Sequence, residues 1–251
     1  MRPIITLLSD FGTADGYVGE IKGVLLSALP LAAVVDITHD VAPQDVDGAR
    51  LAVARYWRRF PAGTVHMVVV DPGVGSSRAA IAVSSDGRHF VGPDNGVLSP
   101  ALLVAGARVI ELPVPPAASS TFHGRDVFAP AAVSLASGIP LDDLGAPLME
   151  PVIRRTPEAR RTDEGDIEGE VISVDRFGNL VTNLVAPRGG SVRVGDAEVP
   201  LGRTYADSAA GAVLAVVGSS GLVEIAVRDG SAARTLGLTR GARVILQPPR
   251  R

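Results

Sequence analysis

The stretch Val68-Val69-Val70-Asp71-Pro72-Gly73-Val74-Gly75-Ser76-Ser77-Arg78 decides the fold class of this chain. Its three consecutive valines predict a β-strand that is covered on both faces, because such strands are almost continuous apolar runs. Pro72 and Gly73 end the strand. Asp71 therefore stands at the carboxyl end of a buried strand, where open α/β sheets bind their ligands. It is either a turn-capping carboxylate or a functional one, and Arg78 lies within its reach.

The elements on the N-terminal side of this stretch predict a Rossmann-like α/β domain. Three apolar strands alternate with two amphipathic helices, the strands at residues 3–9, 33–37 and 65–70 and the helices at 16–29 and 45–59. This alternation predicts a parallel sheet with right-handed crossovers. Asp45 has the position and residue type of a helix N-cap.

The rest of the first domain is predicted to add a hairpin and two further helices. Asp86-Gly87 is a strong hairpin signal between strands expected at 79–84 and 89–91. A short helix is expected at 98–105, a strand at 109–112 and an alanine-rich helix at 127–137.

A change of composition near residue 150 predicts a second domain. Residues 154–165 are polar and show no periodicity, as in a linker or an exposed loop. Six short strands follow, expected at 169–174, 180–184, 191–194, 212–217, 222–227 and 242–246. Their even spacing and glycine turns predict a smaller antiparallel β-barrel or sandwich. The expected organisation is an N-terminal α/β domain at 1–150, a linker at 151–166 and a C-terminal β domain at 167–251.

The composition excludes several classes of function. Of the 251 residues, 46% are hydrophobic, which is enough for a sizeable core, and the net charge of −3 does not favour binding to nucleic acid. The absence of cysteine excludes disulfides, zinc–thiolate sites and thiol nucleophiles. No apolar run is long enough to span a membrane and no signal-peptide pattern is present, so we expect a cytoplasmic protein.

Four carboxylates recur just beyond the predicted strand ends of the first domain: Asp10, Asp40, Asp71 and Asp94. Such a group suits a hard cation, and a metal-dependent phosphohydrolase is one candidate. Asp10 lacks the second aspartate two residues later that many phosphohydrolases use, so we do not expect a metal site. Gly73 and Gly75 also fail as a dinucleotide fingerprint, because Arg78 replaces the third glycine and a strand follows.

Three polar segments could carry chemistry or be purely structural. His123, between Phe122 and Gly124, is either a functional imidazole or a capping residue at a helix entry. The turns at 175–179 and 218–221 could each be a simple hairpin turn.

Together these residues resemble one family. Six motifs occur in its order: Ser9-Asp10-Phe11-Gly12, Asp71-Pro72-Gly73-Val74-Gly75, Gly92-Pro93-Asp94-Asn95-Gly96, Phe122-His123-Gly124-Arg125-Asp126, Asp175-Arg176-Phe177-Gly178-Asn179 and Gly218-Ser219-Ser220-Gly221-Leu222-Val223-Glu224-Ile225-Ala226. The chain is similar over about residues 3–246 to the S-adenosyl-L-methionine (SAM) hydrolases, also called SAM hydroxide adenosyltransferases, which are related to fluorinases and chlorinases.

The resemblance implies an activity and an assembly. The implied reaction is attack of water or hydroxide on the ribose C5′ carbon of SAM, which gives adenosine and L-methionine without a metal or another cofactor. The implied assembly is a homotrimer, in which each site lies between the first domain of one subunit and the second domain of its neighbour.

The resemblance also implies roles for individual residues. Asp71, Arg78 and His123 match the family's catalytic set, and Asp10 matches the residue that binds the ribose hydroxyls. Positions near the methionine portion or the adenosine are matched by Asp175, Phe177, Asn179, Tyr205, Ser219 and Glu224. The halide-using relatives have a tyrosine at the position of Asp71, lack the histidine and, in fluorinases, carry a tryptophan at Gln44.

The chemistry of a sulfonium substrate fits these residues. The positive charge on sulfur disappears as the C–S bond breaks, so methionine leaves as a neutral molecule without help from a metal. Asp71 could orient or deprotonate a water, or Arg78 and His123 could stabilise a hydroxide-like nucleophile. We expect Arg78 to keep Asp71 ionised by charge pairing. Two other functions stay open, a chlorinase-like halide transferase and a non-catalytic protein that binds adenosine or SAM.

Overall fold

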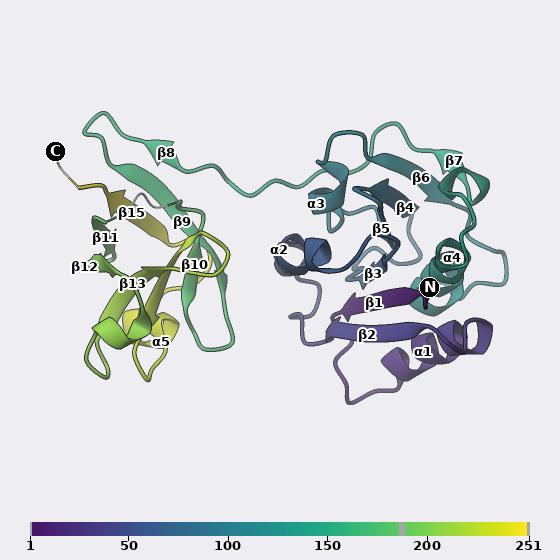
Figure 1. The fold of residues 1–251 in the computed structure, drawn as a ribbon, viewed down its shortest axis with the longest axis horizontal. Helices are drawn as coiled ribbons and strands as arrows, with labels where there is room; N and C mark the ends of the chain where they lie inside the picture. The colour runs from purple at the N-terminus through teal and green to yellow at the C-terminus, as the bar shows by residue number, and fades with distance from the viewer. Residues whose placement is uncertain (1, 186–188, 250–251) are drawn as a thin grey trace. The chain divides into compact units, whose positions relative to one another are not determined.

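The computed structural model describes residues 2–185 and 189–249, which form two compact units (Figure 1). The first unit is Met1–Arg155 and the second is Thr156–Arg251. The boundary falls within the polar segment that follows the last helix of the α/β unit. The two-domain fold predicted from the sequence, an α/β domain followed by a smaller β-barrel or sandwich, is therefore confirmed.

The first unit is built on a seven-stranded mixed sheet. In spatial order the strands are β2 (Ala33–Thr38), β1 (Ile4–Ser9), β3 (Val65–Val69), β5 (Arg88–Pro93), β4 (Ala80–Ser85), β6 (Arg108–Leu112) and β7 (Ala146–Pro147). The β2-β1-β3-β5 half is parallel, and β4 pairs antiparallel with both β5 and β6. The predicted hairpin reverses the chain because Asp86 and Gly87 both have positive φ, at 49° and 70°.

Helices cover both faces of this sheet. One face packs against α1 (Tyr17–Ala28) and α4 (Ala129–Ala136), the other against α2 (Val46–Tyr56) and the single turn α3 (Ser99–Leu102). The central strand follows the same division, because Met67 and Val69 face the first core and Val68 and Val70 face the second. The prediction of a strand buried on both faces is confirmed.

Local capping and a proline explain how two of the helices begin. Asp45 caps α2, since its side chain accepts the Gly48 N–H at 3.0 Å, as predicted. The predicted helix at 127–137 begins differently, as a π-helical turn over Gly124–Phe128 followed by α4. Pro130 is in the first turn of α4 and cannot donate a backbone hydrogen bond, which favours a wider turn before it.

The second unit is a closed barrel of seven strands, which decides between the two predicted architectures. Around the barrel the strands are β9 (Ile167–Val174), β10 (Leu180–Thr182), β14 (Val223–Val227), β13 (Val213–Val217), β12 (Ala197–Gly202), β11 (Ser191–Val194) and β15 (Arg243–Gln247). The β10–β9 pairing closes the barrel, and β8 (Arg160–Arg161) adds to β9. One pair, β12 with β13, is parallel. The sequence did not predict β12 or the short helix α5 (Ala232–Leu236).

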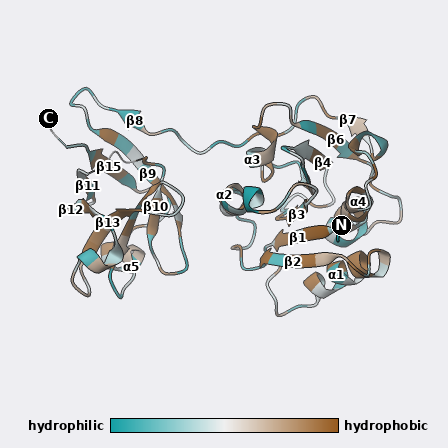
Figure 2. Cartoon of the chain, in the orientation of Figure 1, coloured by the Kyte–Doolittle hydropathy of each residue, from teal (hydrophilic) through white to brown (hydrophobic). Residues whose placement is uncertain are grey.

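Hydrophobic residues are concentrated along the strands of both units (Figure 2). The barrel has its own core, which includes Val171, Leu180, Ile225 and Leu246. None of the helices in residues 2–185 and 189–249 is both long and apolar enough to cross a membrane.

One buried histidine in the first core is expected to make stability depend on pH. His66 in β3 is fully buried, its Nδ1 lies 2.8 Å from Thr6 Oγ1, and the rings of Phe60 and Phe90 pack against it. Burial lowers the pKa of His66 to about 3, whereas a histidine in an unfolded chain has a pKa of about 6.5.

Below about pH 6.5 the unfolded chain therefore takes up a proton that the folded protein does not. We expect the free energy of unfolding to fall by up to ~1.4 kcal/mol per pH unit from this group as the pH drops towards 3. Urea unfolding at several pH values, on the wild type and His66→Gln, measures the difference. Since the other titrating groups are common to both proteins, identical pH dependence would contradict the assignment.

Candidate functional site

Asp71 lies two residues beyond the end of β3, at the start of a tight glycine turn. Gly75 in this turn has a φ of 76°, and a Cβ there would lie 2.4 Å from the Ser120 carbonyl oxygen. Only glycine fits such an approach without strain. The turn is thereby packed against the segment that leads into His123.

Arg78 binds the Asp71 carboxylate through two nitrogens of its guanidinium group. Its Nε donates to Asp71 Oδ1 at 3.0 Å, and its Nη2 donates to Asp71 Oδ2. The two side chains are only 8% and 5% exposed. Arg78 Nη1 also donates to the Ala79 carbonyl at 3.0 Å. This forked, buried ion pair fixes the plane and direction of the carboxylate.

His123 joins the same cluster from the start of the π-helical turn. Its Nδ1 lies 3.2 Å from Arg78 Nη2. A guanidinium can only donate, so Nδ1 accepts and a neutral His123 carries its proton on Nε2. Burial, with the Arg78 charge next, lowers the pKa of His123 and favours this neutral form. The side chain makes no capping hydrogen bond, so the capping interpretation is wrong.

The pKa of Asp71 departs from the expectation based on charge pairing alone. Burial raises the pKa of the Asp71 carboxyl, and the Arg78 charge and hydrogen bonds oppose this effect only in part. The carboxylate is consequently a stronger base than an exposed aspartate would be, even though it is paired with arginine.

Asp71 and His123 line a cavity of about 440 Å³ in the α/β unit. Asp10, which follows β1, lies on the same cavity, and its Oδ2 accepts the Gln44 N–H at 2.8 Å. Gln44 also lines the cavity and has a φ of 66°. The structure therefore brings the predicted ribose-binding residue and two members of the predicted catalytic set, Asp71 and His123, to one cavity.

An aromatic wall completes this cavity, and the sequence did not identify it. Phe11, Tyr17 and Phe122 contact one another with ring centroids 5.4–5.9 Å apart, and all three line the cavity. Phe11 and Phe122 each stand next to a predicted site residue, which was the available signal. Such a wall offers apolar surface to one side of a ligand.

The four strand-end carboxylates do not assemble into a metal site. Asp40 is exposed, and Asp94 Oδ1 accepts the Val152 N–H at 2.9 Å. Among the residues that the structure describes, no three or more histidine, aspartate or glutamate side chains are grouped so that they could hold a metal ion.

In the second unit, three of the predicted residues share the turn between β9 and β10. Asp175 Oδ1 accepts the backbone N–H groups of Phe177 and Asn179 at 2.9 Å each, and its Oδ2 accepts from Asn179 Nδ2 at 2.9 Å. Asp175 thus holds the turn together. Asn179 is buried, whereas the Phe177 side chain projects from the turn and is 77% exposed.

The other three predicted residues of this unit lie near the start of β14. Tyr205 Oη donates to Glu224 Oε2 at 3.1 Å, and Glu224 is buried. A Cβ on Gly218 would lie 1.9 Å from Glu224 Oε1, so glycine makes room for this carboxylate. Ser219 follows in an exposed turn.

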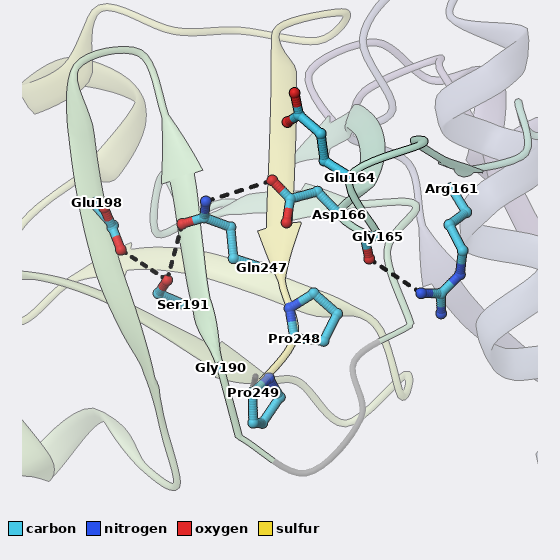
Figure 3. Close-up of a pocket in the computed structure, with 10 residues that line it drawn as sticks. All are labelled: Arg161, Glu164, Gly165, Asp166, Gly190, Ser191, Glu198, Gln247, Pro248 and Pro249. Atoms are coloured by element: carbon cyan, nitrogen blue, oxygen red, sulfur yellow. Dashed lines mark hydrogen bonds between the residues drawn. The ribbon is translucent and has the colours of Figure 1, made fainter. Parts of the chain in front are cut away.

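Another hollow, of about 620 Å³, lies on the second unit outside the barrel core, and none of the predicted residues lines it (Figure 3). Several of its polar side chains pair with one another: Ser191 Oγ donates to Glu198 at 2.9 Å and lies 3.2 Å from Gln247 Oε1, and Gln247 Nε2 donates to Asp166 at 3.4 Å. Arg161 donates to the Gly165 carbonyl at 3.1 Å. Because none of the predicted site residues lines this hollow, the cavity at Asp71 is the stronger candidate.

Comparisons with known proteins cover almost the whole chain. Residues 5–145 match the SAM hydroxide adenosyltransferase N-terminal domain, and residues 169–245 match the C-terminal domain of the same family. An (R)-S-adenosyl-L-methionine hydrolase from Thermus thermophilus is 45% identical over 98% of this chain and 100% of the relative. One from Salinispora arenicola is 41% identical over 95% of each, and a fluorinase from Actinopolyspora mzabensis is 29% identical over 97% and 96%.

Solved structures agree with these sequence matches. The crystal structure of an uncharacterized conserved protein from Thermotoga maritima has a TM-score of 0.88 at 35% identity, covering 97% of this chain and 99% of that one. A conserved hypothetical protein from Thermus thermophilus has a TM-score of 0.83 at 44% identity, covering 98% and 100%.

Proposed function

The chain belongs to the SAM hydroxide adenosyltransferase family, and from this premise we propose that it hydrolyses S-adenosyl-L-methionine to adenosine and L-methionine. The observation that carries the proposal is the buried cluster of Asp71, Arg78 and His123, of which Asp71 and His123 line the 440 Å³ cavity. The higher identity to hydrolases, 37–45% against 28–29% for fluorinases, supports water as the nucleophile.

In the proposed step a water oxygen attacks ribose C5′ while the C–S bond breaks. The bonding electron pair goes to sulfur, which becomes the neutral thioether of methionine, and a water proton is released. The ionised Asp71 carboxylate accepts a hydrogen bond from this water, and Nε2–H of His123 donates one to its oxygen. Holding the water in line is the main task, and positioning of this kind supplies roughly 7–11 kcal/mol in well-oriented reactions.

The pairing with Arg78 sets what Asp71 can do. Both carboxylate oxygens accept from Arg78, so the carboxylate is held in one orientation towards the cavity. Its raised pKa supports a role in which it takes up the water proton as the C5′–O bond forms. The reaction requires no cofactor, because the sulfonium already makes methionine a good leaving group.

Asp10 is proposed to accept hydrogen bonds from the two ribose hydroxyls, as an ionised carboxylate can. For the second unit we propose substrate contacts by Asp175, Phe177, Asn179, Tyr205, Ser219 and Glu224. The exposed rings of Phe177 and Tyr205 support this, since aromatic faces are suited to stacking on a base. The homotrimer and the cytoplasmic location stay predictions, the first from the family resemblance and the second from the sequence.

A halide transferase is the alternative closest in chemistry, since fluorinases belong to the more distant relatives. The buried carboxylate of Asp71 argues against it. An anionic halide next to this group would be repelled, whereas a neutral water can donate a hydrogen bond to it.

We expect the protein to release adenosine and methionine in equal amounts from SAM. With H₂¹⁸O as solvent, the label should enter the 5′-hydroxyl of adenosine, because water attacks C5′. Mass spectrometry of the products measures this, with the (R) and (S) sulfonium epimers tested separately because the curated relatives are named for the (R) form.

Chloride and EDTA provide the controls for this experiment. A 5′-chloro-5′-deoxyadenosine product in chloride would favour the halide transferase, and loss of activity in EDTA would favour a metal-dependent hydrolase. Binding of SAM without turnover would favour a non-catalytic protein that binds adenosine or SAM.

A further inference from the structure

A chain of hydrogen bonds runs from Ser9, the residue before Asp10, to the surface. Ser9 Oγ lies 2.7 Å from His39 Nδ1, and His39 Nε2 lies 3.1 Å from Asp36 Oδ1. Lys22 Nζ in α1 donates to Asp36 Oδ2 at 2.6 Å. None of these four residues lines the cavity. The proposed chemistry gives them no role, although Ser9 and His39 are both buried.

An irregularity in the sheet places His39 opposite Ser9. Strands β1 and β2 pair in parallel with Leu7 opposite Asp36, but the next residue, Leu8, is opposite Thr38. The register therefore shifts by one residue at Ile37, as in a β-bulge, which re-aims the side chains that follow. His39 comes directly after β2 and meets Ser9 at the end of β1.

The segment that carries Asp10 is tied to His39 on both sides. Before Asp10, the Ser9 side chain contacts the His39 ring. After it, the Gly12 N–H donates to the His39 carbonyl at 2.8 Å. The Phe11 N–H also points to Ser9 Oγ, at 3.4 Å. The position of the Asp10 backbone thus depends on His39.

The charge on Asp36 fixes the direction of these bonds in neutral His39. Nε2 faces a carboxylate, which can only accept, so Nε2 carries the proton. Nδ1 then accepts the Ser9 hydroxyl proton, and Ser9 Oγ keeps its lone pairs for the Phe11 N–H. Lys22 holds the carboxylate in place at the surface.

The serine, histidine and aspartate resemble a nucleophilic triad in composition but do not form a reactive one. Ser9 is 3% exposed and does not line the cavity, so a substrate cannot reach its hydroxyl. A purely structural role is the other alternative, and it predicts a loss of stability without a specific effect on ligand binding.

We propose that His39 is a positioning residue, which holds Asp10 against the ribose through Ser9. This inference rests on the proposed function, since it takes Asp10 as the ribose-binding residue. The readouts are the KM and kcat for SAM hydrolysis and the Kd for adenosine, measured by calorimetry, with thermal unfolding of each variant alongside.

Two conservative substitutions of His39 separate the contacts. An asparagine amide reaches about as far as Nδ1, so His39→Asn can keep the contact with Ser9. A glutamine amide reaches about as far as Nε2, so His39→Gln can keep the hydrogen bond to Asp36 but loses the contact with Ser9. Ser9→Ala removes the same contact from the other side. Ser85→Ala is the matched control, because Ser85 ends β4, is equally buried, donates to the Ala101 carbonyl at 2.9 Å and does not line the cavity.

We expect Ser9→Ala and His39→Gln to raise KM and the adenosine Kd by about three- to tenfold, the equivalent of one hydrogen bond, with kcat nearly unchanged. The double variant should be no worse than either single variant, because both remove one contact. His39→Asn and Ser85→Ala should bind like the wild type, and His39→Gln provides the test if Ser9→Ala does not fold.

Equal shifts in His39→Asn and His39→Gln, an unchanged KM in Ser9→Ala, or equal effects of Ser9→Ala and Ser85→Ala would each overturn the inference. If the wild type hydrolyses SAM and Ser9→Ala has the same KM, the inference about His39 is overturned while the proposed function stands. A wild type that neither hydrolyses SAM nor binds adenosine would overturn the proposed function as well.

Discussion

Asp71→Asn is expected to lower kcat for SAM hydrolysis by roughly 10²- to 10⁴-fold, the range associated with a positioned acid–base group. Asparagine keeps the size of the side chain, but its NH₂ group faces an Arg78 donor and its charge is lost. The variant can neither accept the water proton nor pair the guanidinium. Steady-state kinetics at saturating SAM measure the effect, and KM should change much less.

Asp94→Asn is the matched control for this substitution. Asp94 also follows a strand, and burial raises its pKa as well, but it does not line the cavity. An asparagine oxygen can still accept the Val152 N–H that Asp94 binds. Because Asp71→Asn leaves Arg78 buried beside a neutral group, unfolding curves must accompany the kinetics. A kcat within a few-fold of wild type in a folded Asp71→Asn protein would contradict the assignment.

The pH dependence of kcat gives an independent check on Asp71. The active form is the carboxylate, so activity rises with pH as Asp71 ionises. Since burial raises the pKa of Asp71, the acid limb should lie above the ordinary aspartate value of about 4. This limb should disappear in Asp71→Asn, and its persistence would assign it to another group.

The local parts of the fold could be predicted from the sequence because short-range physics decides them. Three valines predicted a strand buried on both faces, Asp86-Gly87 predicted a hairpin, and Asp45 predicted a cap. The arrangement of β4 between β5 and β6 could not be predicted in this way, because strand order depends on long-range pairing. The β10–β9 closure, which makes the second unit a barrel, has the same origin.

In the candidate site, too, local contacts could be predicted from the sequence and long-range ones could not. Arg78 is seven residues from Asp71, and the turn between them made their contact predictable. The rise in the pKa of Asp71 was not predictable, because the burial that causes it depends on tertiary packing, which the sequence pattern does not show. The contact between Ser9 and His39 depends on a shift of register between two strands, which the sequence pattern does not reveal.

Asp10→Ala is expected to raise the KM for SAM and the Kd for adenosine by about 10- to 100-fold, since a hydrogen bond to a charged group contributes roughly 1.5–3 kcal/mol. The kcat should fall far less, because Asp10 is proposed to bind the ribose hydroxyls and not the reacting atoms. Asp10 also accepts the Gln44 N–H, so its removal could act through the loop. Asp10→Asn separates the two effects, because its amide oxygen can still accept from Gln44 while the charge is lost.

The ligand provides the sharper control. Wild-type protein should bind adenosine more tightly than 2′,3′-dideoxyadenosine, because only the former donates to Asp10. In Asp10→Ala this preference should largely vanish, as two deletions of one interaction are not additive. If Asp10 only supported the loop, the substitution would weaken the binding of both nucleosides equally, and the preference for adenosine would survive. A KM within about twofold of wild type would fall below the energy of a single charged hydrogen bond and would contradict ribose binding by Asp10.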